Sequence, residues 1–163
     1  MNVTYHPVGS GSYSATSGTN VANFRLSSDG WLDPSTFRIM FNVVNDDNDG
    51  VKKLRPIGDV YAFFRRLRVS VRGILIEDID DFNRLSHMFS LFQTPQSRIN
   101  DKMEGFGYNK TINELKTPLR LPGITNSQTV MFKPLSGFFE QKKFIPLKYC
   151  PIEIELELAN EAD

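Results

Sequence analysis

The stretch AFFRRLRVSVRGILIEDI, residues 62–79, decides the fold class of this chain. Apolar and polar residues alternate along it, and a single glycine interrupts the alternation near its middle. Side chains of a strand point to opposite faces in turn, so Leu67, Val69 and Val71 share one face while arginines line the other. The stretch therefore predicts two antiparallel strands joined by a tight glycine turn, with one face for a core and the other for water or a partner.

Similar alternation predicts further strands on both sides of this hairpin. Residues 36–44 and 152–158 alternate over their whole length, and shorter runs at 23–26 and 129–133 have the same character. Thirteen Phe and five Tyr suit the space between two facing sheets. We therefore expect a mainly β protein, a jelly-roll-type antiparallel β-sandwich.

One segment changes period from two to between three and four. Its apolar residues predict an amphipathic helix at about 80–93, and they are Phe82, Leu85, Met88, Phe89 and Phe92. Acidic side chains at the start of a helix bind its unpaired amides, which is the role we expect for Asp78, Asp80 and Asp81.

Composition sets the limits of domain organisation and partners. The chain has 163 residues, with 19 basic and 19 acidic side chains, which is enough for one domain. Residues 1–20 are rich in Gly and Ser and predict a flexible arm, so the single domain should span 21–163. Zero net charge argues against a protein whose main task is to coat nucleic acid. No run is apolar and long enough to predict a membrane span.

Catalytic and metal-binding motifs are not found in the sequence. It contains no G-x-S-x-G, Walker A, H-E-x-x-H or C-x-x-C pattern, and it has two His and one Cys. The acidic loop at 45–50 matches the start of an EF-hand, but Pro56 stands where a bidentate Glu is required. We therefore expect a protein that is not an enzyme and holds no metal or cofactor.

The segment from Thr94 to Asn126 is irregular and rich in Pro and Gly. A loop of this length in a compact domain is usually functional or packed against a neighbour. The sequence therefore predicts a contact surface for other subunits here, with the apolar residues Ile99, Met103, Phe106, Tyr108 and Leu115.

Several short motifs, in this order, carry a resemblance to a known family. They are WLDPST at 31–36, FFRRL at 63–67, IEDI at 76–79, NR at 83–84, EGFG at 104–107, SGF at 136–138, PL at 146–147 and ELEL at 155–158. Together they resemble the N-terminal part of the major capsid proteins of polinton-like viruses and adintoviruses. None of these motifs is specific alone.

The resemblance implies a structural virion protein. Such proteins are double jelly rolls whose trimers form the capsomers of an icosahedral double-stranded DNA virus, assembled after synthesis in the cytoplasm or nucleus of the host. The implied partners are copies of the same chain, other capsid proteins and, weakly, the genome. The chain resembles strands B to G of the first roll, so its last strands and the second roll are missing from the match. A truncated or endogenised copy would explain that length.

Two other classes of function stay open. The first is a cellular β-sandwich module that binds carbohydrate or peptide, and exposed aromatic side chains would favour it. The second is a carboxylate-based jelly-roll hydrolase, which requires two carboxyl groups facing each other across a cleft. Large apolar patches on several sides would instead favour the capsid interpretation.

The closing strand also predicts a charge ladder. Whether residues 152–158 form strand G or strand I, they should pair with residues 63–72, since both are neighbours of the fourth strand in a jelly roll. Opposite charges would then face each other on the outer side of the sheet, from Arg66, Arg68 and Arg72 to Glu153, Glu155 and Glu157. We expect this ladder to fix the register of the two strands and to perform no chemistry.

Overall fold

A computed structural model describes residues 2–9, 11–14, 20–45, 47–49, 51, 53–54, 60–92, 94, 121–122 and 126–160. The chain is mainly β, with antiparallel sheets and one helix of 11 residues, as the sequence predicts. It forms two compact units. The first comprises Met1–Phe37, Phe63–Arg84 and Leu135–Asp163, and the second comprises Arg38–Ala62 and Leu85–Pro134.

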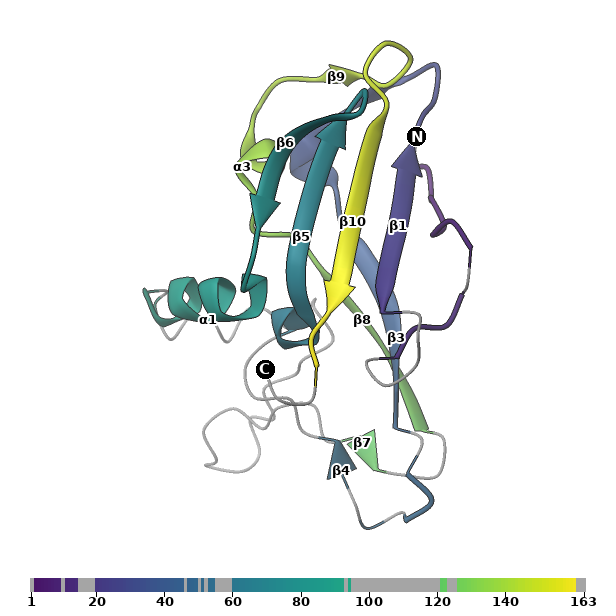
Figure 1. The fold of residues 1–163 in the computed structure, drawn as a ribbon, viewed down its shortest axis with the longest axis vertical. Helices are drawn as coiled ribbons and strands as arrows, with labels where there is room; N and C mark the ends of the chain where they lie inside the picture. The colour runs from purple at the N-terminus through teal and green to yellow at the C-terminus, as the bar shows by residue number, and fades with distance from the viewer. Residues whose placement is uncertain are drawn as a thin grey trace. The chain divides into compact units, whose positions relative to one another are not determined.

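The first unit is built on a four-stranded antiparallel sheet. Its order is β1 (Val21–Leu26), β10 (Ile152–Leu158), β5 (Phe64–Val71) and β6 (Ile74–Ile79), as Figure 1 shows. The predicted pairing of the last strand with the arginine-bearing strand is confirmed. In this sheet β10 lies between β1 and β5.

One face of this sheet is apolar and buried. The residues on it that are less than one-tenth exposed are Ala22, Leu26, Phe64, Leu67, Val69, Ile152, Ile154 and Leu156. Each large side chain among them contributes about 1.5–3 kcal/mol by leaving water. The other face is polar, so the sheet has the two-sided character of a sheet in a β-sandwich.

A bulge near the start of β5 keeps Phe64 on the buried face. Leu158 pairs with Phe64 while Glu157 pairs with Arg66, so Arg65 is an additional residue on β5. Strict alternation from Leu67 would place Phe64 on the polar face. The additional residue restores it to the core side, where it is 5% exposed.

Short elements complete the first unit. They are β2 (Trp31–Leu32), which pairs with β9 (Ile145–Pro146), the 3-10 helix η1 (Pro34–Thr36) and the helical turn α3 (Gly137–Glu140). The Asp33 carboxylate accepts a hydrogen bond from the backbone N–H of Ser35 at 3.0 Å and so caps η1. Phe139 of α3 is fully buried and stacks on Phe37, with ring centroids 4.3 Å apart.

The second unit contains the pair β3 (Ile39–Asn45) and β8 (Asn126–Phe132), the pair β4 (Lys53–Leu54) and β7 (Leu121–Pro122), and most of the 3-10 helix η2 (Val60–Phe63). Its buried apolar residues are Ile39, Val43, Val60, Val130 and Phe132. On the opposite face of β3 and β8, the Thr129 hydroxyl donates to the Asn42 side-chain oxygen at 2.7 Å.

The acidic loop after β3 forms consecutive turns closed by its own side chains. The side-chain oxygens of Asn45, Asp47 and Asp49 accept hydrogen bonds from the backbone N–H two residues later, at 2.9–3.2 Å. Asn and Asp are common in turns of this kind, because their side chains hydrogen-bond the backbone two residues later.

The helix α1 (Phe82–Phe92) agrees with the predicted range but not with the predicted apolar face. Phe82, Ser86 and Ser90 are buried, whereas Met88, Phe89 and Phe92 are exposed. The small serines fill the buried side, and the Ser90 hydroxyl donates to the carbonyl of His87 at 2.7 Å. The apolar stripe that the sequence assigned to the core therefore faces outward over most of its length.

Candidate functional site

The polar face of the four-stranded sheet holds the residues of the predicted charge ladder. Cross-strand pairing places Glu155 opposite Arg68 and Glu157 opposite Arg66. Arg68 in turn lies opposite Asp78 of β6, and Glu155 lies opposite Asn23 of β1. A column of arginines on β5 is thus flanked by acidic side chains on both neighbouring strands.

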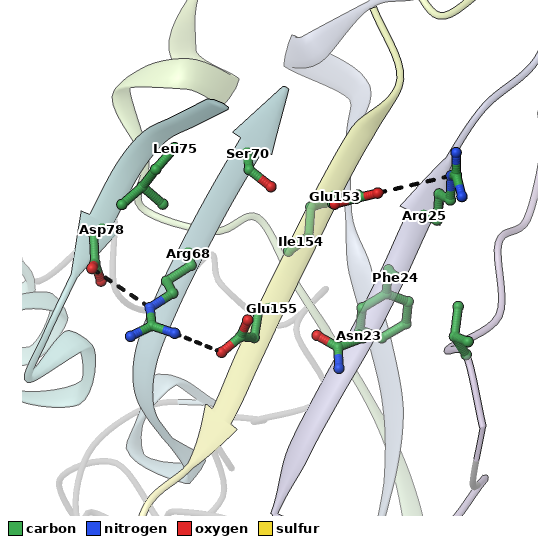
Figure 2. Close-up of a pocket in the computed structure, with 11 residues that line it drawn as sticks. Asn23, Phe24, Arg25, Arg68, Ser70, Leu75, Asp78, Glu153, Ile154 and Glu155 are labelled. Carbon is green, nitrogen blue, oxygen red and sulfur yellow. Dashed lines mark hydrogen bonds and ion pairs between the residues drawn. The ribbon is translucent and has the colours of Figure 1, made fainter. Parts of the chain in front are cut away.

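Arg68 is the centre of this face. Its Nη1 donates to Glu155 Oε1 at 3.0 Å, and its Nε lies 3.5 Å from Asp78 Oδ2. Figure 2 shows the guanidinium extended between the two carboxylates, which come from β10 and β6. One arginine therefore joins three adjacent strands, and the Arg68–Glu155 pair is the rung of the predicted ladder that forms a direct ion pair.

Arg66 makes a two-bond ion pair with Asp78. Its Nε donates to Asp78 Oδ1 at 2.8 Å and its Nη2 donates to Oδ2 at 2.7 Å. Hydrogen bonding from Arg66 lowers the pKa of Asp78 below its ordinary value, and the same bond raises the pKa of Arg66. The expected partner Glu157 is opposite in register, but the guanidinium turns to the acid of β6.

The bulge residue Arg65, and not Arg66 as predicted, forms the ion pair with Glu157. Arg65 Nη1 lies 3.9 Å from Glu157 Oε1, and Arg65 Nε lies 4.0 Å from Asp80 Oδ1. Nothing in simple alternation predicted this contact, because alternation assigns Arg65 to the opposite face from Arg66.

Two members of the ladder do not pair as predicted. Glu153 lies opposite Ser70, and it forms an ion pair with Arg25 of β1 at 3.9 Å. Arg72 is not part of β5, because it occupies the turn to β6 with a φ of 54°. Its backbone N–H donates to the carbonyl of Pro151 at 3.1 Å, so the turn residue is held by its main chain.

Asp78 also corrects the helix-cap hypothesis. It belongs to β6 and binds Arg66 and Arg68, so it does not cap α1. A second acidic residue of β6 has a structural role of a different kind. The Glu77 carboxylate accepts hydrogen bonds from the Ser136 hydroxyl, from the backbone N–H of Gly137 at 2.9 Å and from that of Phe138 at 3.4 Å. Glu77 thus fastens β6 to the start of α3.

The polar face is shallowly hollowed. The groove has a volume of about 520 Å³ and is lined by Arg25, Arg68, Ser70, Leu75, Asp78, Glu153 and Glu155, among others. Its carboxylates are each in contact with an arginine (Figure 2). A pair of carboxyl groups for glycosidic hydrolysis must leave one of them to act as an acid. Here Arg68 stands between Asp78 and Glu155, which favours a structural role for both.

The five predicted contact residues Ile99, Met103, Phe106, Tyr108 and Leu115 lie outside the described residues. Within the described part of the chain, no group of three or more His, Cys, Asp or Glu is placed to hold a metal ion. The longest helix there is α1, and none is long and apolar enough to cross a membrane. Cys150 is a free thiol.

Sequence patterns missed a different set of surface residues. Large apolar side chains are exposed on β2, β3, β6, α1 and the turns beside β9, namely Trp31, Met40, Ile74, Leu75, Ile76, Met88, Phe89, Leu91, Phe92, Phe144 and Tyr149. Periodicity could not find them, because it says which residues share a face and not whether that face is covered. The run Ile74-Leu75-Ile76 was the one available signal, since it breaks the alternation.

Comparisons with known proteins add no family to these observations. No family model, curated protein or solved structure matches the chain.

Proposed function

We propose that this chain is a structural capsid protein, a building block of the trimeric capsomers of an icosahedral double-stranded DNA virus, and not an enzyme. The observation that carries the proposal is the number of elements with large exposed apolar side chains. Such residues occur on β2, β3, β6 and α1 and beside β9. Soluble monomers rarely expose extended apolar surface, whereas subunits of an assembly cover it with neighbours.

The arrangement of the sheet supports the same proposal. The order β1-β10-β5 corresponds to strands B, I and D of a jelly roll, and the sequence motifs resemble those of jelly-roll capsid proteins. The departure is β6, which follows β5 directly in the same sheet. In a jelly roll the strand after D crosses to the other sheet.

The charged face also favours a structural role over contact with a genome. Its arginines are bound by Asp78, Asp80, Glu153, Glu155 and Glu157. Phosphate binding requires cations that can exchange counterions for phosphate, and these cations already have acidic partners. These arginines are therefore poor candidates for contact with a genome.

The test is assembly of the purified chain over a range of concentrations. We expect sedimentation velocity to show closed oligomers, with trimers among them, and negative-stain electron microscopy to show particles of regular shape. Phe92→Lys should reduce association because it puts a charge on the exposed apolar stripe of α1. His87→Lys is the matched control, since His87 is exposed on the same helix. A monomer at every concentration would contradict the proposal.

One observation favours a binding module as the second candidate. Trp31 and Phe144 are 69% and 65% exposed, and Trp31 lies on the short two-stranded ribbon formed by β2 and β9. Exposed aromatic rings are stacking surfaces for sugar rings and for proline side chains. Trp31 is the only tryptophan, so its fluorescence reports on this surface directly. Saturable quenching of this fluorescence by an oligosaccharide or a proline-rich peptide would favour the module. Calorimetry should then show that Trp31→Ala no longer binds the same ligand.

A further inference from the structure

The two edges of the four-stranded sheet differ in how they are covered. Beside β1, the backbone N–H of Val8 donates to the carbonyl of Asn23 at 2.7 Å, so the N-terminal segment lies along that edge. The other edge is β6, which pairs with β5 on one side. Among the described residues, none pairs with β6 on its other side. Within the part of the chain that the structure describes, the outward N–H and C=O groups of β6 therefore have no strand partner.

The side chains of β6 make this edge unusual. Ile74, Leu75 and Ile76 are consecutive and are 67%, 55% and 53% exposed. Edge strands are normally protected by lysine, by proline or by an inward charge, because an unprotected apolar edge pairs with other chains. This half of β6 carries no such residue, and its one irregularity is the additional residue Ile76, which has no partner on β5. Its two acids, Glu77 and Asp78, are bound to Ser136 and to Arg66, so neither projects from the edge as a guard.

We propose that β6 pairs in antiparallel fashion with β6 of a second copy of this chain, about a two-fold axis at Leu75. In that register Leu75 faces its own counterpart and Ile74 faces Ile76, so that each exposed apolar residue meets an apolar residue. The exposed half of the strand is thus complementary to itself in apolar character.

The two-fold pairing is favoured over a head-to-tail arrangement. Joining β6 of one copy to β1 of the next would require the N-terminal segment at Val8 to leave Asn23. Pairing β6 with β6 breaks no strand pairing among the described residues and joins two four-stranded sheets into one of eight strands. The inference follows from this edge alone, so it does not depend on the proposed role in a capsid.

Cysteine cross-linking tests the axis directly. In a Cys150→Ser background, Leu75→Cys places two thiols opposite each other at the two-fold axis, where Cβ atoms of facing residues are about 4.5–5.5 Å apart, close to disulfide range. Val44→Cys is the matched control, because Val44 is an exposed apolar residue of β3. We expect mild oxidation to convert Leu75→Cys to a covalent dimer and to leave Val44→Cys monomeric.

Charge variants test the same contact without a disulfide. Ile76→Lys should lower the dimer fraction in sedimentation at least tenfold, because it places a like charge on both sides of the axis, and its circular dichroism should be unchanged. Equal cross-linking of both cysteine variants, or dimers that persist in Ile76→Lys, would overturn the inference. Loss of the dimer in Ile76→Lys with larger oligomers retained would support the inference and leave the capsid proposal intact.

Discussion

Strands β10 and β6 belong to the same sheet and differ in almost every other respect. β10 is paired on both sides, and Ile152, Ile154 and Leu156 are at most 1% exposed. Among the described residues β6 pairs with β5 alone, and it contains an additional residue at Ile76 and exposes Ile74, Leu75 and Ile76. Both were predicted as strands, β10 from its alternation and β6 from its place after the glycine turn. The comparison teaches that a sequence pattern can predict a strand. The place of that strand in the sheet decides whether its apolar residues are buried and how much they stabilise the fold.

The largest difference between the two strands should appear in stability. Leu156→Ala removes a fully buried side chain and should lower the free energy of unfolding by about 2–5 kcal/mol. Leu75→Ala changes the same residue type on β6 and should cost only about 0.5 kcal/mol or less in the dilute protein. Equilibrium unfolding in urea measures both. Equal losses of stability would show that β6 is as well packed as β10 and would contradict the proposed difference between the two strands.

The second prediction concerns Glu77, which connects β6 to the start of α3. Glu77→Gln replaces the carboxylate that binds the Ser136 hydroxyl and the N–H groups of Gly137 and Phe138. An amide accepts fewer of these bonds, so we expect a loss of about 1–3 kcal/mol in urea unfolding. Glu153→Gln is the control, because Glu153 is exposed and pairs with Arg25 at 3.9 Å. A loss no greater than that of the control would mean that β6 is not fastened to α3.

Regular alternation accounts for the part of the fold that could be predicted. The last strand was predicted at 152–158, and β10 has those bounds, because each inward residue along it is Ile or Leu and each outward one between them is Glu. The pairing of β10 with β5 followed from jelly-roll topology, and the Arg68–Glu155 ion pair followed from that pairing. These predictions needed only two kinds of information, namely which face of the sheet each residue lies on and which strand lies beside which.

The remainder of the site depended on features that alternation does not contain. The bulge at Arg65 moved one arginine onto the polar face, and the turn at Arg72 removed another from the strand. Asp78 of β6 was assigned to a helix cap, because the hairpin β5–β6 was predicted from its turn and not from its cross-strand pairs. In α1, the burial of Ser86 and Ser90 in place of Met88 and Phe92 reflects what surrounds the helix, which its own periodicity cannot report.

The third prediction sharpens the comparison at the turn between β5 and β6. Arg72 and Gly73 both have positive φ, at 54° and 78°, which is the geometry of the type I′ turn that prefers Asn-Gly. Arg72→Asn should therefore raise the free energy of unfolding by about 0.5–1 kcal/mol, since Asn tolerates this conformation better than Arg. Arg72→Ala should give no such gain. A destabilised Asn variant would mean that the Arg72 side chain contributes more than its backbone strain costs.

The smallest expected effect concerns pH and the acid that joins β6 to β5. Because Arg66 lowers the pKa of Asp78, the folded state holds this proton less tightly than the unfolded chain. The resulting stabilisation is complete above the ordinary pKa of an aspartate and is lost as the pH falls through the lower pKa of the folded state. Arg66 has a raised pKa and stays protonated throughout, so it adds no pH dependence here.

Asp78→Asn tests this directly in urea unfolding from neutral to acidic pH. The wild type should be the more stable protein at neutral pH, by less than the Glu77→Gln loss, and the difference should shrink as the solution becomes acidic. Both residues are partly exposed, so high salt should also reduce the difference. Curves that stay parallel down to acidic pH would mean that the ion pair contributes nothing to holding β6. The edge strand would then depend on Glu77 and its backbone ladder alone.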